Sequence, residues 1–405
     1  MQDASGYAVS SASAPAVAAY DLALDAQLHA WPGALAALDL ALRHDPVFAL
    51  AQAARALVLQ AQGQGALARP AIAQARESCT GATERERSQV TLLADLVEGR
   101  PVAALQAVQT HAEHWPADAL AMSTALGAFG LFAFSGRLDH DAARLAFVKR
   151  IAPHYPADNP WLLTQLSWAH TEAGEPEAGL ELIQRSLALR QANGHAAHVM
   201  LHALFERHDS AAALRFADAW LPQYPVQAVL HGHLNWHAAL SEIDLGDIDA
   251  ALSRGLRMVL PHLQHALPLV GLTDAASLLW RLSLAGRDGQ DWTVVRRYAE
   301  QKFPKGGNPF VELHLAMRAA AQRDTAGLAG GAARLKRQAD AGHAGAVTAL
   351  HWVGALQALL AGQPDAANAA FQACLADAPR LGGSHAQRTV INRTAAATLL
   401  PRDGA

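Results

Sequence analysis

The sequence is poor in cysteine, in long apolar runs and in positive charge, and each absence excludes a class of protein. Cys79 and Cys374 are the two cysteines among 405 residues, so we expect no disulfide framework and predict a reducing, cytoplasmic location. No segment approaches the roughly 20 apolar residues that cross a bilayer, so no membrane span is predicted. The formal net charge is −4 and no basic run occurs, so nucleic acid is not an expected partner.

Sequence motifs of common enzymes are also missing. The chain has no Walker loop, no G-x-S-x-G turn and no C-x-x-C pair. A glycine-rich phosphate cradle and the standard nucleophiles therefore have no support. The sequence leaves open whether the protein is an enzyme, which cofactor it uses and whether it forms oligomers.

The chain consists mostly of helix-forming segments, rich in Ala and Leu, that alternate with short breaks. In one such unit Ala34, Ala37 and Ala41 share a helix face, and the helix ends at Asp45-Pro46. Small residues at helical spacing let two helices approach closely, and proline stops a helix. This pattern is typical of tetratricopeptide helix pairs of about 34 residues. Later first helices are predicted to begin near Trp161, Gly194, Gln227, Leu267, Pro309 and Gly345.

The fold class that this pattern predicts is all-α, a right-handed superhelical array of tetratricopeptide-like helix pairs, or α-solenoid. We predict a single helical-repeat domain over residues 19–400, with a histidine-lined groove mainly in 160–395. Residues 1–18 are rich in Ser and Ala and lack the pattern of a secretory signal. Because chain ends are poorly ordered unless something holds them, we expect a disordered leader there.

Polar residues recur at one place in successive helix pairs, about 37 to 40 residues apart. Equivalent positions in stacked repeats line one continuous surface, so these side chains are expected to lie along it together. The set consists of His198, His237, Asp274, His314 and His351.

Two predicted helices each carry histidines four residues apart, His198 with His202 and His233 with His237. Such pairs can reach one ion, and imidazole suits Zn, Fe, Cu or Ni, so a divalent metal bound by these four residues is one interpretation. In a second interpretation no metal is bound and the four histidines are catalytic groups that transfer protons. In a third, the histidines join adjacent helices by hydrogen bonds and fill the core.

Other residues are candidates for ligand binding. Asp274 and Arg281 share a helix face, where the carboxylate would orient one imidazole. Arg281 and Arg388 would clamp an anion. His314 lies in the next first helix and is included in the ligand-binding set.

The segment 381–392 stands apart, because it combines two glycines with several polar side chains. A Gly-Gly turn followed by Ser384 as a helix N-cap explains part of it. It does not explain Gln387, Arg388 and Asn392. These three side chains either close the end of the array or reach into the groove as ligand-binding groups.

Three blocks of sequence carry a resemblance to a known family. They are A-H-V-M-L-H at 197–202, H-L-N-W-H-A-A-L at 233–240 and L-G-G-S-H-A-Q-R at 381–388. Over roughly residues 85–395 the chain resembles the tetratricopeptide repeat protein 38 family. The resemblance implies a helical-repeat fold, and it supplies no established reaction or ligand.

Two functions from different classes are therefore expected. In the first, a histidine-rich internal pocket binds a small polar or anionic molecule, with its conversion as a further step. In the alternative, the protein is an adaptor that receives a peptide in the concave groove. A narrow, closed pocket would favour the first function and a long, open groove the second.

Overall fold

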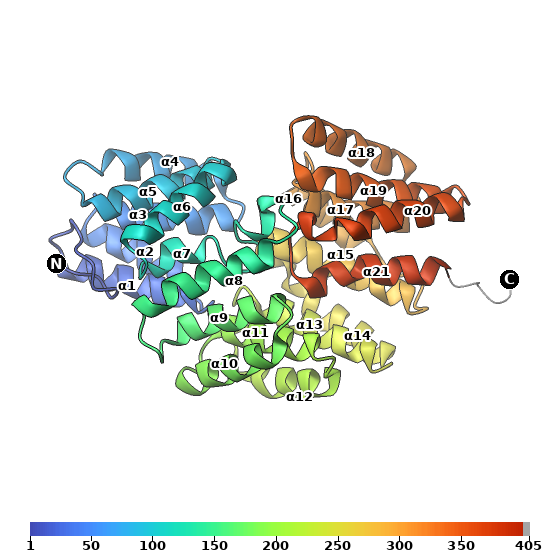
Figure 1. Cartoon of the computed structure of the whole chain (residues 1–405), viewed down its shortest axis with the longest axis horizontal. Coiled ribbons are helices and arrows are strands. Elements are labelled where there is room, and N and C mark those ends of the chain that lie inside the picture. The colour runs from blue at the N-terminus through green and yellow to red at the C-terminus, as the bar shows by residue number, and fades with distance from the viewer. Residues whose placement is uncertain (400–405) are drawn as a thin grey trace. The chain divides into compact units, whose positions relative to one another are not determined.

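The computed structural model describes residues 1–399, so Leu400, the last residue of the predicted domain, lies outside the described part (Figure 1). Within that part every regular element is a helix, and the remaining pairing is one isolated bridge between Gln2 and Ala8. The predicted all-α array of helix pairs is confirmed. Within the described residues, no helix has the length and apolar character needed to cross a membrane.

The described chain forms two compact units. The first unit comprises residues 1–132, 141–203 and 227–230. In it α1 packs on α2, α3 on α4, α5 on α6 and α9 on α10. Its helices are α1 (Ala14–Leu28), α2 (Ala34–His44), α3 (Ala49–Ala61), α4 (Gly65–Glu77), α5 (Glu84–Val97), α6 (Pro101–His114), α7 (Ala119–Ser123), α8 (His140–Ile151), α9 (Pro160–Glu172), α10 (Pro176–Leu189) and most of α11 (Gly194–Glu206).

The second unit comprises residues 133–140, 204–226 and 231 onwards. Here the first helices of successive pairs contact one another in chain order, α13 with α15, α15 with α17 and α17 with α19. Its helices are α12 (Ser210–Trp220), α13 (His231–Asp244), α14 (Ile248–Arg254), the π-helical turn η4 (Gly255–Val259), α15 (Pro268–Leu284), α16 (Thr293–Lys302), α17 (Pro309–Ala321), α18 (Thr325–Asp340), α19 (Ala344–Leu360), α20 (Pro364–Ala376) and α21 (His385–Leu399).

Local capping explains where the helices begin. Asn159 accepts a hydrogen bond from the Leu162 amide and is followed by Pro160 at the first helical position, and Asn308 does the same before Pro309. An Asn cap satisfies an amide that the helix leaves unpaired, and proline has no amide to satisfy. The predicted first helices begin within four residues of their expected positions, at Pro160, Gly194, His231, Pro268, Pro309 and Ala344.

Hydrogen bonds between first helices of the second unit show the repeat length directly. The Trp236 indole on α13 donates to the Ser277 hydroxyl on α15 at 3.0 Å. The Trp352 indole on α19 donates to the Leu313 carbonyl on α17 at 3.1 Å. Both indoles are fully buried, and a buried indole needs an acceptor, so these bonds fix how neighbouring helices align.

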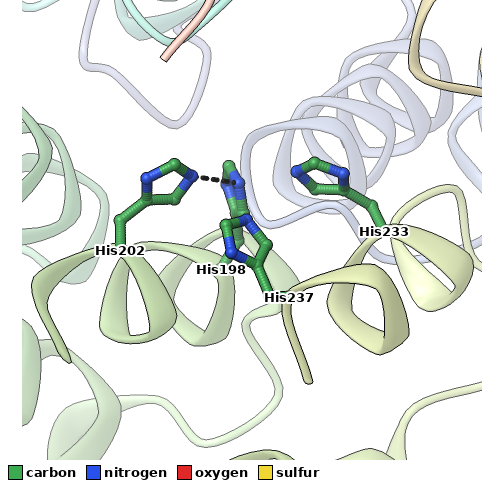
Figure 2. Close-up of side chains that lie close together, drawn as sticks. All are labelled: His198, His202, His233 and His237. Carbon is green, nitrogen blue, oxygen red and sulfur yellow. Dashed lines mark hydrogen bonds between the residues drawn. The ribbon is translucent and has the colours of Figure 1, made fainter. Parts of the chain in front are cut away.

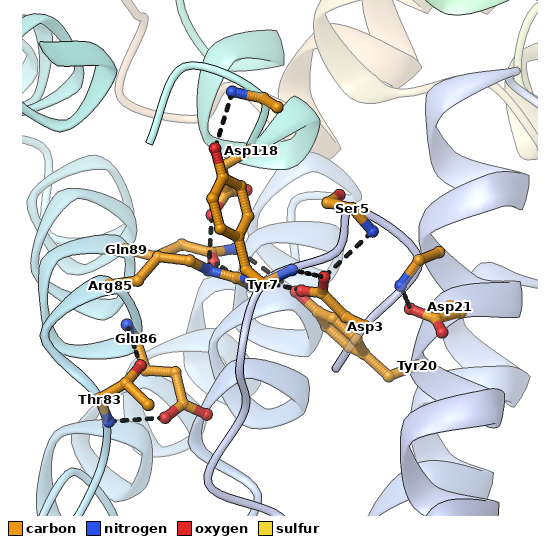
Figure 3. Close-up of polar contacts among 12 residues, drawn as sticks. Asp3, Ser5, Tyr7, Tyr20, Asp21, Thr83, Arg85, Glu86, Gln89 and Asp118 are labelled. Atoms are coloured by element: carbon orange, nitrogen blue, oxygen red, sulfur yellow. Dashed lines mark hydrogen bonds and ion pairs between the residues drawn. The ribbon is translucent and has the colours of Figure 1, made fainter. Parts of the chain in front are cut away.

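The sequence analysis expected a disordered leader over residues 1–18; in the structure residues 14–18 belong to α1, and residues 1–13 make specific contacts in the first unit (Figure 3). Asp3 is 7% exposed and pairs with Arg85 of α5 at 2.5 Å. Arg85 is buried and also pairs with Asp118 at 3.1 Å. The Ser10 hydroxyl donates to Glu86 at 2.9 Å. A buried ion pair holds this segment, and residue composition does not reveal such a pair.

Candidate functional site

The first histidine pair lies on α11, where His198 and His202 face each other. Their Nε2 atoms are 2.9 Å apart. The Trp168 ring of α9 stacks on His198, with centroids 5.8 Å apart, and meets His202 edge-on at 4.6 Å. Two ring nitrogens this close either share one proton or direct two lone pairs at one cation. The Trp168 indole contacts both rings and so restricts their rotation.

A carboxylate lies on the far side of one ring of this pair. The Glu172 Oε1 atom, at the end of α9, is 3.3 Å from Nδ1 of His202, and both side chains are buried. The opposite nitrogen of the same ring, Nε2, is the one that faces His198. A carboxylate at Nδ1 favours the proton on that nitrogen and leaves Nε2 as a lone-pair donor.

The second pair lies on α13 and has the same chemistry. Nδ1 of His233 donates to the Asp274 carboxylate, with both oxygens at 2.9 Å. The His233 ring stacks on Trp236 at 5.3 Å and meets His237 edge-on at 4.8 Å. Burial raises the pKa of Asp274, while His233 and Arg281 oppose that rise. The sequence predicted that Asp274 would orient an imidazole, and the structure places it against His233.

Each pair therefore has one imidazole with a buried carboxylate beside Nδ1: Asp274 is hydrogen-bonded to His233, and Glu172 lies at an ion-pair distance of 3.3 Å from His202. Metal-ligating histidines usually have such a partner, which fixes the ring and raises its basicity. Sequence reasoning missed Glu172, because it lies 30 residues before His202, at a spacing unrelated to the repeat. The signal that could have identified Glu172 is an acidic residue at the end of a helix next to the histidine-bearing helix.

Figure 2 shows the side chains of both pairs together. One ligand atom from each of His198, His202, His233 and His237 lies within 4.8 Å of those of the other three. Nitrogen atoms around a tetrahedral zinc ion, at bonds of about 2.0–2.1 Å, lie roughly 3.4 Å apart. The 4.8 Å limit is wider than this spacing, so the nitrogens would have to move closer together to hold one ion.

Arg281 of α15 is a buried cation for which the described residues supply no carboxylate at ion-pair distance. It is 1% exposed, and its Nη2 donates to the Ala386 carbonyl at 2.9 Å and the Thr389 hydroxyl at 3.2 Å. Nε and Nη1 are buried with no hydrogen-bond partner among the described residues. Burial lowers the pKa of Arg281 to about 9. A charge left in this state is costly unless an anion compensates it.

The Arg281 guanidinium and the second histidine pair contact the same side chain. Arg281 lies over the Trp236 ring, 5.5 Å from its centroid, and the same indole contacts both His233 and His237. The predicted anion-binding group is therefore one indole ring away from the histidines of α13.

His314 of α17 is a buried neutral base. Its Nδ1 donates to the Phe310 carbonyl at 2.8 Å, so in the neutral ring Nε2 carries the lone pair. Nε2 has no partner among the described residues. Burial lowers the pKa of His314 to about 4, and the positive charge of Arg281 contributes to this shift.

The polar side chains of the 381–392 segment make bonds at the start of α21. Gln387 Oε1 accepts from the Ser384 amide at 3.0 Å, and the Ser384 hydroxyl accepts from the Gln387 amide at 3.2 Å. Arg388 donates to the Gly383 carbonyl at 2.5 Å. Asn392 is exposed. These contacts account for Gln387 and Arg388 as parts of a helix cap, and ligand binding by the segment remains a prediction.

The helix pairs and their packing define this chain as a tetratricopeptide-like helical-repeat protein. No protein-family model matches the sequence, so membership of the tetratricopeptide repeat protein 38 family remains a prediction. Among solved structures, the chain is similar to the tetratricopeptide-repeat domain of P58(IPK), at 16% identity and a TM-score of 0.23. That match covers 71% of this chain and 87% of the other. A likeness this slight carries no argument about function.

Proposed function

We propose that this protein holds a divalent transition-metal ion at His198, His202, His233 and His237 and binds a small anionic molecule beside it. The observation that carries the proposal is that one nitrogen from each of the four histidines lies within 4.8 Å of those of the other three, with a buried carboxylate beside Nδ1 of His202 and of His233. The arrangement is the one that metal-ligating imidazoles usually have.

The choice of ion follows from the donor atoms. Four neutral imidazoles and no thiolate suit Zn, Cu, Ni or Fe, whereas Mg and Ca prefer oxygen ligands. Two buried carboxylates lie behind these imidazoles, Glu172 beside His202 and Asp274 beside His233, so the anionic character of the second ligand rests on Arg281 and not on the charge of the ion.

Arg281 supports the anionic character of the ligand. Its unpartnered Nε and Nη1 atoms are two donors in one plane, the geometry that matches a carboxylate or a phosphate group. His314 adds a buried acceptor, Nε2, which suits a hydroxyl or a protonated oxygen of the same molecule. Conversion of the bound molecule would use such a neutral base for proton transfer.

Metal content of the purified protein tests the proposal. Protein prepared without an affinity tag, loaded with zinc and dialysed, is expected to retain about one ion per chain by elemental analysis. His202→Ala and His237→Ala are each expected to lower retention at least tenfold, while His114→Ala, which removes an exposed histidine of α6, leaves it unchanged. If the parent protein retains less than one ion per chain and the two variants retain as much as the parent, the histidines have only a packing role. That result would favour the peptide-binding adaptor.

A further inference from the structure

A groove in the second unit is formed by α16, α17 and α18. Its volume is about 380 Å³, within the range of about 300–1,000 Å³ that binding pockets have. Three arginines and two glutamates line it, together with apolar side chains that include Phe303, Leu315 and Val353. The four histidines of the proposed metal site and the predicted ligand-binding residues do not line this groove.

The groove lies in a basic part of an acidic chain. Residues 293–340, which comprise α16, α17 and α18, contain nine Lys and Arg but four Asp and Glu, so their formal charge is +5. The whole chain has a net charge of −4. A local excess of this kind attracts anionic groups before contact, over about 8 Å at physiological ionic strength.

The three arginines of the groove are accessible to solvent. The side chains of Arg296, Arg318 and Arg334 are 42%, 17% and 31% exposed. Neighbours hold the first two at one edge, since Arg296 donates to Glu300 and Arg318 to Gln322, each at 3.1 Å. A guanidinium has five N–H donors, so a bond at one edge leaves donors for a ligand at another.

Arg334 is held by a buried carboxylate. Its Nε and Nη2 donate to the two oxygens of Glu312 at 2.7 and 2.9 Å, and Glu312 is 1% exposed. The charge of Glu312 is therefore compensated inside the protein and is not presented to the groove. The third nitrogen of Arg334, Nη1, lies beside Gly330, where a β-carbon would be 3.5 Å from it.

Two glycines leave one wall of the groove without side chains. Gly330 and Gly331 line the groove and lie in the interior of α18. A β-carbon at either position would meet its nearest neighbour at 3.5 Å, which is an ordinary contact, and alanine is the better helix former. Helix packing therefore does not require glycine at these positions, whereas an open groove does.

The arginines are spaced along the groove. Arg334 is bound to Glu312 and Arg318 to Gln322, and these partners are ten residues apart on α17, or about 15 Å along the helix. A single small anion does not bridge such a distance. Five residues of extended chain do, because they span about 13 Å from the first Cα atom to the last.

We infer that this groove binds an extended acidic segment of a partner protein, with two carboxylates four residues apart that pair with Arg318 and Arg334. The peptide would run along the glycine wall, and an apolar side chain between the two acids would contact Phe303 and Leu315, which are half-buried. Extended segments bind in this way, through charged ends and alternate side chains. A phosphate chain would match the charge but would make no use of the apolar residues.

Calorimetric titration with matched, acetylated and amidated peptides tests the inference. The peptide E-A-L-A-E is expected to bind about tenfold more tightly than the neutral Q-A-L-A-Q, because two ion pairs are lost in the latter. E-E-A-L-A has the same composition and charge, and it is expected to bind about fivefold more weakly than E-A-L-A-E because its carboxylates are adjacent. Equal affinity for all three peptides would overturn the inference. Tripolyphosphate that displaces E-A-L-A-E and binds more tightly would overturn the choice of a peptide.

Two variants with matched controls locate the binding site. Arg318→Gln should weaken binding of E-A-L-A-E about fivefold, while Arg323→Gln, at an exposed position outside the groove, should change it less than about twofold. Gly330→Leu should narrow the groove and weaken binding further, while Ala329→Leu, the exposed neighbour outside the groove, should not. Unaltered affinity in Arg318→Gln would overturn the inference even if Gly330→Leu failed to fold. The outcome is independent of the proposed metal site, because the groove contains none of its four histidines.

Discussion

Single buried residues of the second unit carry much of the chemistry proposed here, and their protonation states are linked to stability. His314 is 1% exposed, and burial lowers its pKa from 6.5 to about 4. A group whose pKa is depressed in the folded state contributes stability above the unfolded pKa and loses it as the pH falls through the folded value. The sensitive window for His314 therefore lies between pH 6.5 and about 4.

The first prediction is that the free energy of unfolding falls by on the order of 3 kcal/mol over this window because of His314. Urea unfolding at pH 7 and pH 4.5 measures it. In His314→Phe the dependence on pH should be shallower by about that amount, because no proton is taken up at this position on unfolding. His114→Phe, at an exposed position, should keep the parent slope. Equal slopes in parent and His314→Phe would contradict the prediction.

Arg281 gives the second prediction at this scale. Replacing a buried charge that lacks a carboxylate partner with an apolar side chain is often neutral or stabilising by about 1–4 kcal/mol. Arg281→Met should therefore unfold at the same or a higher temperature in buffer without multivalent anions. The parent should be stabilised by millimolar phosphate or oxalate, and the variant should not. A large loss of stability with an unchanged response to phosphate would show that Arg281 serves only to bind the start of α21.

At the scale of elements, the turn before α21 shows how backbone conformation and packing coincide. Gly382 and Gly383 have φ values of +78° and +72°, which only glycine adopts readily. A β-carbon on Gly383 would lie 2.5 Å from the Phe310 ring, and one on Gly382 would lie 2.4 Å from Phe134. The sequence predicted a Gly-Gly turn capped by Ser384, and the described bonds of Ser384 and Gln387 agree with it.

We predict that Gly383→Ala lowers the free energy of unfolding by roughly 2–4 kcal/mol, from backbone strain and the contact with Phe310. Chemical denaturation measures the loss. Gly354→Ala is the control, because a β-carbon there meets nothing within 4 Å on a helix, where alanine is favoured. A neutral Gly383→Ala would show that α21 can shift away without cost.

Much of the fold could be predicted from sequence because its signals are local. An Asn or Asp cap, a proline at the first helical position and the periodicity of apolar residues all act within a few residues. The predicted starts of the first helices therefore lie within four residues of the observed starts. Glu172 and Asp3 could not be predicted in this way. Glu172 of α9 lies beside His202 of α11, and Asp3, which precedes α1, pairs with Arg85 of α5. No repeat or motif specifies either separation in sequence.

The N-terminal segment gives a prediction at the scale of elements. Asp3 and Asp118 together compensate the buried guanidinium of Arg85. Asp3→Ala leaves half of that compensation and should cost roughly 2–3 kcal/mol of unfolding free energy. Ser5→Ala, on the same segment, should cost much less. Denaturation of the first unit, followed by hydrogen exchange at α5, measures the effect, and unchanged protection there would contradict it.

At the scale of the whole molecule, a metal centre would link ligand binding to the stability of the repeat array. An ion that binds only the folded chain stabilises it by about 2.7 kcal/mol at a free concentration of 100 times Kd. An ion that the four histidines hold in the folded chain alone would therefore add its binding free energy to the stability of the fold.

The last prediction follows from this linkage. Zinc at 100 times its Kd should raise the thermal midpoint of the parent by a few degrees, and a chelator should reverse the change. The gain should be smaller in acid than at neutral pH, because an imidazole must lose its proton to bind the ion. His202→Ala should abolish the gain in thermal midpoint. Glu172→Gln should lower the apparent affinity for zinc about tenfold, because it removes the carboxylate beside Nδ1 of His202. A zinc-induced shift that survives in His202→Ala and does not depend on pH would mean that the ion binds elsewhere.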